Sequence, residues 1–241
     1  MTDTNTMNLS ENSNKINKSG YRRIKQLAFF LAITGILFFV PAGTIKWLNG
    51  WLYLGTYLLA VFVMFILMKN KDPELINKRG IVAKNVKKWD KVIMTLYVIA
   101  LTTMPVIASL DAVRFGWSFM SPLWLIPGFI MAVIAFLLGT WAMMSNTHFE
   151  TYVRIQEERE HKPITEGPYR FIRHPGYAGA IFFFFCSPFI LGSWWSFIPC
   201  SLMTILFTIR TYKEDLTLQE ELPGYKEYTE KVRYRLLPGI F

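Results

Sequence analysis

The polar stretch 167–179 is the part of this chain whose residue types most clearly point to chemistry. It reads Gly-Pro-Tyr-Arg-Phe-Ile-Arg-His-Pro-Gly-Tyr-Ala-Gly and immediately precedes a long apolar segment. Arginine and histidine are costly inside hydrocarbon, so a cationic cluster where an apolar segment begins indicates a functional site by default. A simpler interpretation is a membrane stop, in which Arg173 reaches lipid phosphate and Pro175 opens the next helix. The segment adds three further polar rings, at Tyr169, His174 and Tyr177. These donors and rings favour a site.

A second polar group follows the apolar segments, at Arg210, Glu214 and Asp215. Arg210 and Glu214 are four residues apart and therefore share one helix face. An ordinary ion pair between them, with Asp215 merely exposed, would explain the pattern without a function. In a functional site, the two carboxylates would hold a cationic ligand. Glu220 and Glu221 form a weaker acidic pair that is typical of a solvated surface.

Several common catalytic signatures are absent from the sequence. No Gly-x-Gly-x-x-Gly follows a strand pattern, and neither a P-loop nor a Gly-x-Ser-x-Gly occurs. The three histidines form no His-x-x-x-His pair, and the two cysteines, Cys186 and Cys200, lie in apolar segments without metal-ligand spacing. We therefore expect neither a metal site nor a Rossmann-type cofactor site.

The elements that must position these residues are apolar segments of the length that crosses a bilayer. The mean hydropathy is +0.28, with 52% hydrophobic and only 18% charged residues, which is typical of a membrane protein. Six apolar segments can be delimited, at 27–44, 51–68, 92–109, 123–144, 178–192 and 194–209. The last two are short and contain Pro188, Gly192 and Pro199, so we expect 178–209 to form a helical hairpin that turns near Gly192.

The expected fold is therefore an all-α integral membrane protein with about six hydrophobic helices, or five spans if the hairpin counts once. A polar tail at 1–26 precedes four transmembrane helices within 27–144. Residues 145–241 form the predicted catalytic region, which contains the hairpin and ends in a cytosolic helix. Because a hairpin returns the chain to the side it left, its two polar flanks become neighbours, and a site built from both would lie at the membrane surface.

The distribution of basic residues predicts the orientation of these helices. All 26 lysines and arginines except Lys46 and Arg114 fall in the two tails and in the second and fourth connections. The positive-inside rule then puts both termini and the candidate site in the cytosol, at a bacterial inner membrane or the endoplasmic reticulum. A single crossing by 178–209 would put the C-terminal tail on the wrong side. Topology and contact with anionic lipid also explain the net charge of +9, which argues against nucleic-acid binding.

On these residues the chain resembles the isoprenylcysteine carboxyl methyltransferase and phospholipid methyltransferase superfamily of integral membrane enzymes. The matching motifs before the hairpin are Val153-Arg154-Ile155-Gln156, Gly167-Pro168-Tyr169-Arg170 and Arg173-His174-Pro175-Gly176-Tyr177-Ala178-Gly179. Those after it are Arg210, Glu214-Asp215, Leu218, Gly224-Tyr225, Tyr228 and Arg235-Leu236-Leu237-Pro238. The N-terminal half is similar only loosely, through Asp72-Pro73-Glu74-Leu75 and Trp89-Asp90-Lys91.

The resemblance implies S-adenosylmethionine as the methyl donor. It implies these cofactor-binding residues: Gln156, Tyr169, His174, Pro175, Tyr177, Glu214 and Asp215. The family often has Glu-Glu where this chain has Glu214-Asp215, so the role of Asp215, one methylene shorter, is less secure. Arg173 and Arg210 are the candidate catalytic residues, which would orient an anionic acceptor or the carboxylate of the cosubstrate.

The sequence leaves the acceptor open, as it does the oligomeric state. A prenylated-cysteine carboxylate, a phospholipid amine, a thiol or another small or lipophilic molecule would each fit. No dedicated base is evident, which mildly favours an acceptor that is already anionic. An NADPH-dependent membrane reductase is an alternative, because sterol reductases look distantly similar in their C-terminal part. A non-catalytic scaffold or transporter is another, although polar residues are scarce inside the first four apolar segments.

Overall fold

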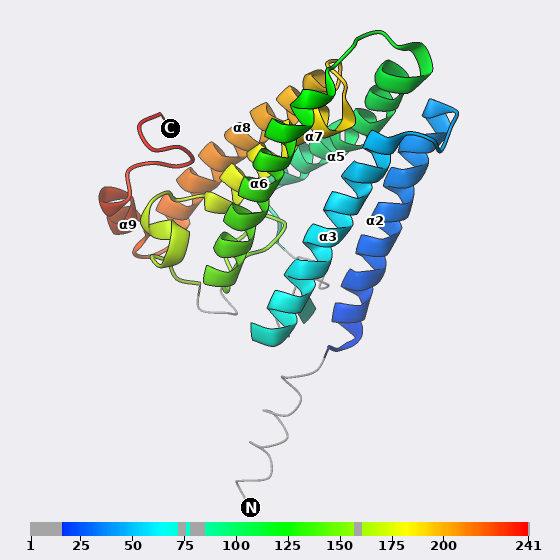
Figure 1. Ribbon diagram of the computed structural model, residues 1–241. Helices are drawn as coiled ribbons and strands as arrows, with labels where there is room; N and C mark the ends of the chain where they lie inside the picture. The colour runs from blue at the N-terminus through cyan, green and yellow to red at the C-terminus, as the bar shows by residue number, and fades with distance from the viewer. Residues whose placement is uncertain (1–15, 72–75, 78–84, 157–160, 241) are drawn as a thin grey trace, which may run out of the picture.

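The computed structural model describes residues 16–71, 76–77, 85–156 and 161–240, and within these ranges the chain is helical and has no strand (Figure 1). The long helices are α2 (Lys18–Ala42), α3 (Leu48–Lys71), α5 (Lys88–Ser109), α6 (Leu125–Ser145), α7 (Pro175–Leu191) and α8 (Phe197–Glu221). A short helix, α9 (Tyr225–Lys231), follows α8. The residues 1–15 of the predicted polar tail and the motif at 72–75 lie outside the described residues.

Four of these helices have the length and composition of membrane spans. They are Lys18–Ala42, Leu48–Lys71, Lys88–Phe115 and Pro122–Ser145, where α5 continues into a π-helical turn and a 3₁₀ turn precedes α6. Helix α7 is a shorter apolar helix. Many apolar side chains on the outer surface of the bundle are exposed, for example Phe29, Leu59 and Phe62. In water such a surface would aggregate, whereas in lipid it is the expected exterior. The predicted all-α membrane fold is confirmed.

The predicted helical hairpin is also confirmed. Helix α7 ends at Leu191 and is capped by Gly192, whose left-handed backbone (φ 72°) lets its N–H donate to the carbonyl of Pro188. The chain then reverses within residues 192–196 and returns as α8. This helix runs on beyond the predicted end of the apolar segment at residue 209, to Glu221, so its polar second half carries the acidic residues of the candidate site.

Helices α6 and α7 pack closely because small residues line their contact. A Cβ added to Gly179 would lie 3.0 Å from the backbone N of Gly139 and 3.1 Å from the carbonyl O of Ala135. A Cβ on Gly128 would lie 2.9 Å from Cβ of Phe189. Close backbone approach of this kind is the usual way that helices associate in lipid, where the hydrophobic effect supplies no driving force between them.

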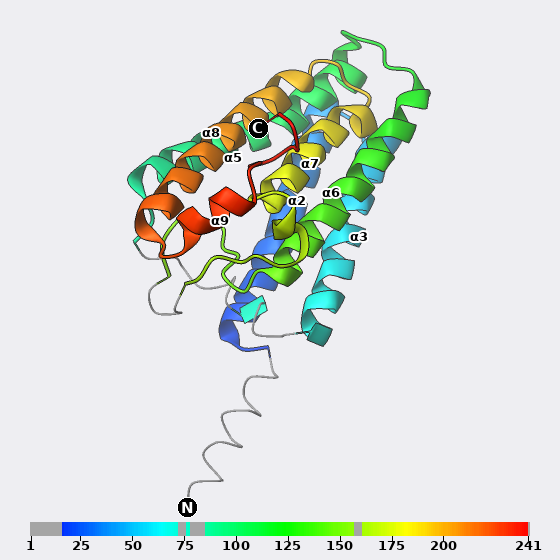
Figure 2. The same ribbon diagram turned by 90° about the vertical axis from the view of Figure 1, so that its left-hand side faces the viewer.

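The connections gather at two ends of the bundle (Figure 1). At one end, here called the far end, lie the α2–α3 turn, the α5–α6 connection and the α7–α8 turn. At the other, the site end, lie residues 146–156 and 161–174, α9 and the C-terminal segment. This segment is tied to the start of α7, because Arg173 and His174 donate their backbone N–H groups to the carbonyls of Tyr234 and Arg235, each at 2.9 Å. Figure 2 shows the segment running back along the bundle past α9.

Candidate active site

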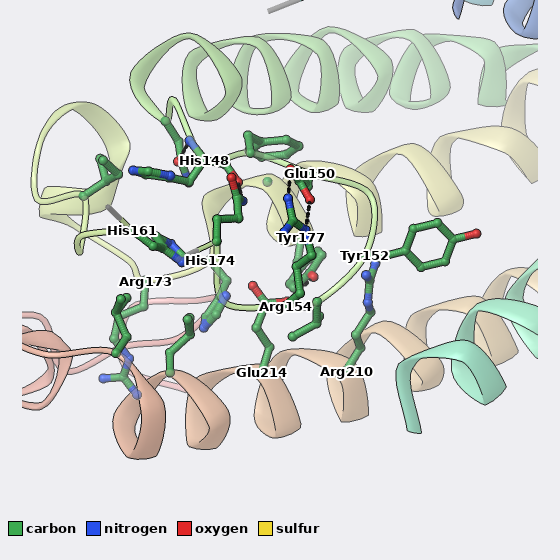
Figure 3. A pocket seen from close by; sticks show the side chains of 18 of the residues that line it. His148, Glu150, Tyr152, Arg154, His161, Arg173, His174, Tyr177, Arg210 and Glu214 are labelled. Carbon is green, nitrogen blue, oxygen red and sulfur yellow. Dashed lines mark hydrogen bonds and ion pairs between the residues drawn. The ribbon is translucent and has the colours of Figure 1, made fainter. Parts of the chain in front are cut away.

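A cavity of about 340 Å³ lies at the site end, between α5, α7 and α8 and beneath residues 146–156 and 161–164. Its size is within the usual range for a small-molecule site. The side chains that line it come from every one of these elements and from Tyr225 and Tyr228 on α9 (Figure 3). The two polar flanks of the hairpin therefore meet here.

The two sides of the cavity differ in chemistry. Met94, Tyr97, Ala180 and Phe207 form an apolar wall where the cavity meets the helices of the bundle. The other lining side chains are largely polar or aromatic, and they include His148, Glu150, Arg154, His161, Arg173, His174, Arg210 and Glu214. The cavity thus offers a polar compartment next to an apolar one.

Asp215 organises the wall formed by α8 and the C-terminal segment. Its fully buried carboxylate accepts hydrogen bonds from Nε and Nη2 of Arg173 at 2.7 and 2.9 Å. Further donors surround it, namely Nε of Arg235 at 2.9 Å, Nε2 of Gln219 at 2.8 Å and the hydroxyl of Tyr225 at 3.1 Å, with Nε2 of His174 at 3.2 Å. Burial alone would raise the pKa of Asp215, but the bonds and charges of His174 and Arg173 outweigh it and hold that pKa well below its usual range.

A second buried ion pair joins α5 to α8. Nε of Arg210 lies 2.7 Å from Oδ1 of Asp90, and Nη2 lies 3.2 Å from Oδ2. Nη2 also donates to the carbonyl of Thr151 at 2.6 Å. The guanidinium is 5.3 Å from the ring centre of Tyr177, so one face of it is covered by an aromatic ring. Arg210 therefore pairs with Asp90 on a distant helix, and not with Glu214 one turn away.

The side chains of Glu214 and Tyr177 meet in the wall of the cavity. The Tyr177 hydroxyl donates a short hydrogen bond to Oε2 of Glu214. The ring of Tyr177 stacks on that of His174, with centres 5.7 Å apart and planes 7° from parallel. The carboxylate of Glu214 accepts from a neutral donor and forms no ion pair with any residue that the structure describes, unlike Asp90 and Asp215.

Residues 146–156 cover the cavity. Within them Arg154 pairs with Glu150 through Nε and Oε2, 2.8 Å apart (Figure 3). Gln156 donates from Nε2 to the carbonyl of His148 at 2.7 Å, which folds this segment back on itself. The ring of Phe149 lies against Gly176, where an added Cβ would come within 2.7 Å of it.

The 3₁₀ turn Gly167–Arg170 places Tyr169 at the edge of the cavity. Gly167 adopts a left-handed backbone (φ 58°), and a Cβ there would collide with Ser145 at 2.2 Å, so this position requires glycine. The carbonyl of Tyr169 accepts a hydrogen bond from the Tyr228 hydroxyl at 2.6 Å, and its own hydroxyl lies 3.0 Å from Nδ2 of Asn146.

The structure brings most of the predicted site residues to one cavity. Its wall contains these: Gln156, Tyr169, Arg173, His174, Tyr177, Arg210 and Glu214. Pro175 and Asp215 do not line it. Pro175 is the first residue of α7, and Asp215 lies behind the wall with its carboxylate surrounded by donors. No group of three or more metal-ligating side chains occurs in the part of the chain that the structure describes.

Sequence reasoning missed other parts of the wall. It gave Tyr225 and Tyr228 no role beyond their place in the quoted motifs, and it gave no role to Glu150, although Arg154, its partner, lies in another of these motifs. It also gave Asp90 no role beyond its place in the motif Trp89-Asp90-Lys91, which precedes an apolar segment. A carboxylate at such a position was nevertheless a usable signal, because a charge near the bilayer requires a partner.

Comparison with known proteins matches the part of the chain that builds this cavity. Residues 123–222 match the model of the family described as phospholipid methyltransferase. Two curated relatives are named probable protein-S-isoprenylcysteine O-methyltransferase, from Oryza sativa subsp. indica and subsp. japonica, and each is 31% identical over 108 residues. The match covers 44% of this chain and 56% of each relative, so the chain spans about half the length of the curated relatives it matches. The C-terminal half of this chain is therefore similar to the isoprenylcysteine and phospholipid methyltransferases, as its motifs predict.

Proposed function

We propose that this protein transfers a methyl group from S-adenosylmethionine to a lipophilic or small acceptor at the cytosolic surface of a membrane. One observation carries the proposal: the cavity presents Glu214, a carboxylate of the family-matched stretch that pairs with no cation among the described residues, beside stacked aromatic rings.

The charges of the cavity wall suit a cationic donor. Each lining arginine is paired with a carboxylate, since Arg154 binds Glu150, Arg173 binds Asp215 and Arg210 binds Asp90. Glu214 is the lining carboxylate that these pairs leave over. S-adenosylmethionine carries a sulfonium, an ammonium and a carboxylate, so its net charge is positive and complements that residue. Aromatic rings stabilise cations over their faces, and the cavity wall contains further rings, for example those of Phe149 and Tyr152.

The same wall suits the remaining parts of the reaction. S-adenosylmethionine supplies an electrophilic methyl group when bound. Glu214 would hold the ammonium, and His174, which also lines the cavity, would meet the carboxylate of the donor. Methyl transfer is an in-line displacement, in which alignment and exclusion of water supply much of the rate. The covering residues 146–156 would exclude water.

The apolar wall supports an acceptor with a lipophilic part. Met94, Tyr97, Ala180 and Phe207 come from the helices that would lie in the membrane, so an apolar tail would meet them while its reactive group reaches the polar side. An acceptor that arrives as a carboxylate or thiolate needs no base, whereas an amine would have to lose a proton. The cytosolic placement rests on the basic residues gathered at the site end.

Binding of the donor to detergent-purified protein tests the proposal. Calorimetry with S-adenosylmethionine and S-adenosylhomocysteine is expected to show saturable binding to the wild type. Glu214→Gln removes the charge but keeps the shape, and we expect it to weaken both ligands by about tenfold or more. Glu220→Gln makes the same change on the same helix at an exposed position outside the cavity, and it is expected to bind as the wild type does.

Two results would contradict the proposal. The first is the absence of binding by wild type that unfolds cooperatively and runs as one species on gel filtration. The second is preferential binding of NADPH, which would favour a membrane reductase. Equal loss of binding in Glu214→Gln and Glu220→Gln would also count against the proposed site, because it would show that the donor does not bind specifically at Glu214.

A further inference from the structure

Asp90 connects three parts of the candidate site although it lies before residues 123–222, which match the family model. It stands in the first turn of α5, and its side chain is completely buried. Its carboxylate binds Arg210 on α8 and also accepts the backbone N–H of Val153 at Oδ2, at 2.8 Å. One side chain thus joins α5, α8 and the residues that cover the cavity.

The pairing with Asp90 decides where Arg210 points. Arg210 and Glu214 lie one turn apart on the same helix, a spacing at which arginine and glutamate readily pair. The guanidinium instead meets Asp90, with both of its bonds to that carboxylate buried. Without this partner, a buried cation would lack a counter-charge, and Glu214 is the nearest replacement on its own helix. The pair with Asp90 therefore leaves the charge of Glu214 available to a ligand.

Asp90 also fixes the covering segment at its middle. Val153 is held by both of its backbone groups, because its N–H donates to Asp90 and its carbonyl accepts from the N–H of Lys87 at 3.3 Å. Two residues earlier, the carbonyl of Thr151 accepts from Arg210. The cavity residues Glu150 and Arg154 flank these anchored positions, so their place over the cavity depends on the same carboxylate.

We propose that Asp90 is a positioning residue of the donor site, which holds Arg210 away from Glu214 and anchors residues 151–153 over the cavity. This inference rests on the proposed function, since it assumes that Glu214 receives the donor. It adds a residue from the N-terminal half, before the family-matched residues 123–222, to a site otherwise built from the C-terminal half.

Three variants of the full chain, each checked for thermal unfolding, test the inference by binding of S-adenosylhomocysteine. Asp90→Asn is expected to weaken binding about tenfold, because Arg210 then turns to Glu214. Asp111→Asn is the control, since Asp111 is also completely buried but lies at the far end. We expect this variant to bind S-adenosylhomocysteine within about twofold of the wild type. The double variant Asp90→Asn/Arg210→Met removes both charges, and it is expected to bind more tightly than Asp90→Asn alone.

Recovery of binding in the double variant, measured at a temperature at which thermal unfolding shows every variant to be fully folded, is the result that a purely structural role would not produce. Wild-type-like binding by Asp90→Asn, or equal losses in Asp90→Asn and Asp111→Asn, would overturn the inference while leaving the proposed function intact. If Asp90→Asn does not fold, the double variant decides, because removal of both members of a buried pair is tolerated better than removal of one. A folded double variant that does not bind would then overturn it. Absence of binding by the wild type would instead count against the proposed function.

Discussion

The two ends of this bundle both contain completely buried aspartates, but they use them differently. At the site end, Asp90 and Asp215 bind arginine side chains. At the far end, Asp111 binds neutral donors, namely the hydroxyls of Ser193 at 2.6 Å and Ser118 at 2.7 Å. The comparison shows where the molecule places paired charges: beside the cavity, and not where it only has to hold a turn.

The neighbours of each aspartate fit this division. Asp111 fastens the α7–α8 turn to the end of α5, and exposed aromatic side chains such as Trp117, Phe119 and Trp195 surround that end, as is typical of a membrane interface. Asp215 lies behind a wall that faces a cavity. A buried ion pair adds little stability over apolar packing, but it fixes side chains in one arrangement. That property is useful where a ligand must be oriented.

Removal of the charge of Asp215 is the strongest test of the difference between the two ends of the bundle. Asp215→Asn leaves Arg173 buried without its counter-charge, and we expect a loss of about 3–5 kcal/mol in the free energy of unfolding. Asp111→Asn removes an acceptor of hydroxyl groups, and we expect the smaller loss of about 1–3 kcal/mol. Unfolding of both variants in detergent, followed by circular dichroism, would measure the difference. Equal losses would mean that the charges at the two ends have the same role.

A methyl group added at Gly176 tests the shape of the cavity at the site end without changing a charge. Gly176→Ala would push the ring of Phe149 outward, because the new Cβ comes within 2.7 Å of it. We expect donor binding to fall about tenfold with little loss of stability, since a side chain and not backbone has to move. Gly55→Ala on α3 is the control, because an added Cβ there meets no atom within 4 Å. Binding by Gly176→Ala at the wild-type level would show that Phe149 is not part of the donor site.

Much of this molecule could be predicted from its sequence, and the exceptions share one physical cause. Apolar length and the positions of glycine and proline predicted the helices and the hairpin, because both signals are local. The motifs predicted Tyr177 and Glu214 as neighbours, since a hairpin brings its flanks together. The carboxylate with which each arginine pairs was not predictable. The i, i+4 spacing favoured a pair between Arg210 and Glu214, yet Arg210 binds Asp90, 120 residues away. Competition between a local and a distant carboxylate depends on helix packing.

Asp215 shows the same limit. Its place beside Glu214 in the sequence predicted a second ligand-binding carboxylate, but adjacent residues of a helix point in different directions. Glu214 faces the cavity, whereas Asp215 faces Arg173 and the C-terminal segment. The family motif identifies both positions without telling which carboxylate meets a ligand and which one organises the wall. The role of Asp215 in donor binding stays a prediction, and its contacts favour an indirect one.

The smallest effect on stability and donor binding is expected from the exposed ion pair that, like the Asp90–Arg210 pair, joins α5 to α8. Lys87 and Glu221 also join the start of α5 to the end of α8, with Nζ 2.6 Å from Oε1, but their side chains are 30% and 42% exposed. Solvent screens such a pair, so Lys87→Met should lower stability by less than about 1 kcal/mol and leave donor binding unchanged. The backbone N–H of Lys87 still reaches Val153 in this variant. If Lys87→Met weakened binding as much as Asp90→Asn, any link between α5 and α8 would suffice to form the site, and the buried position of Asp90 would have no special part in it.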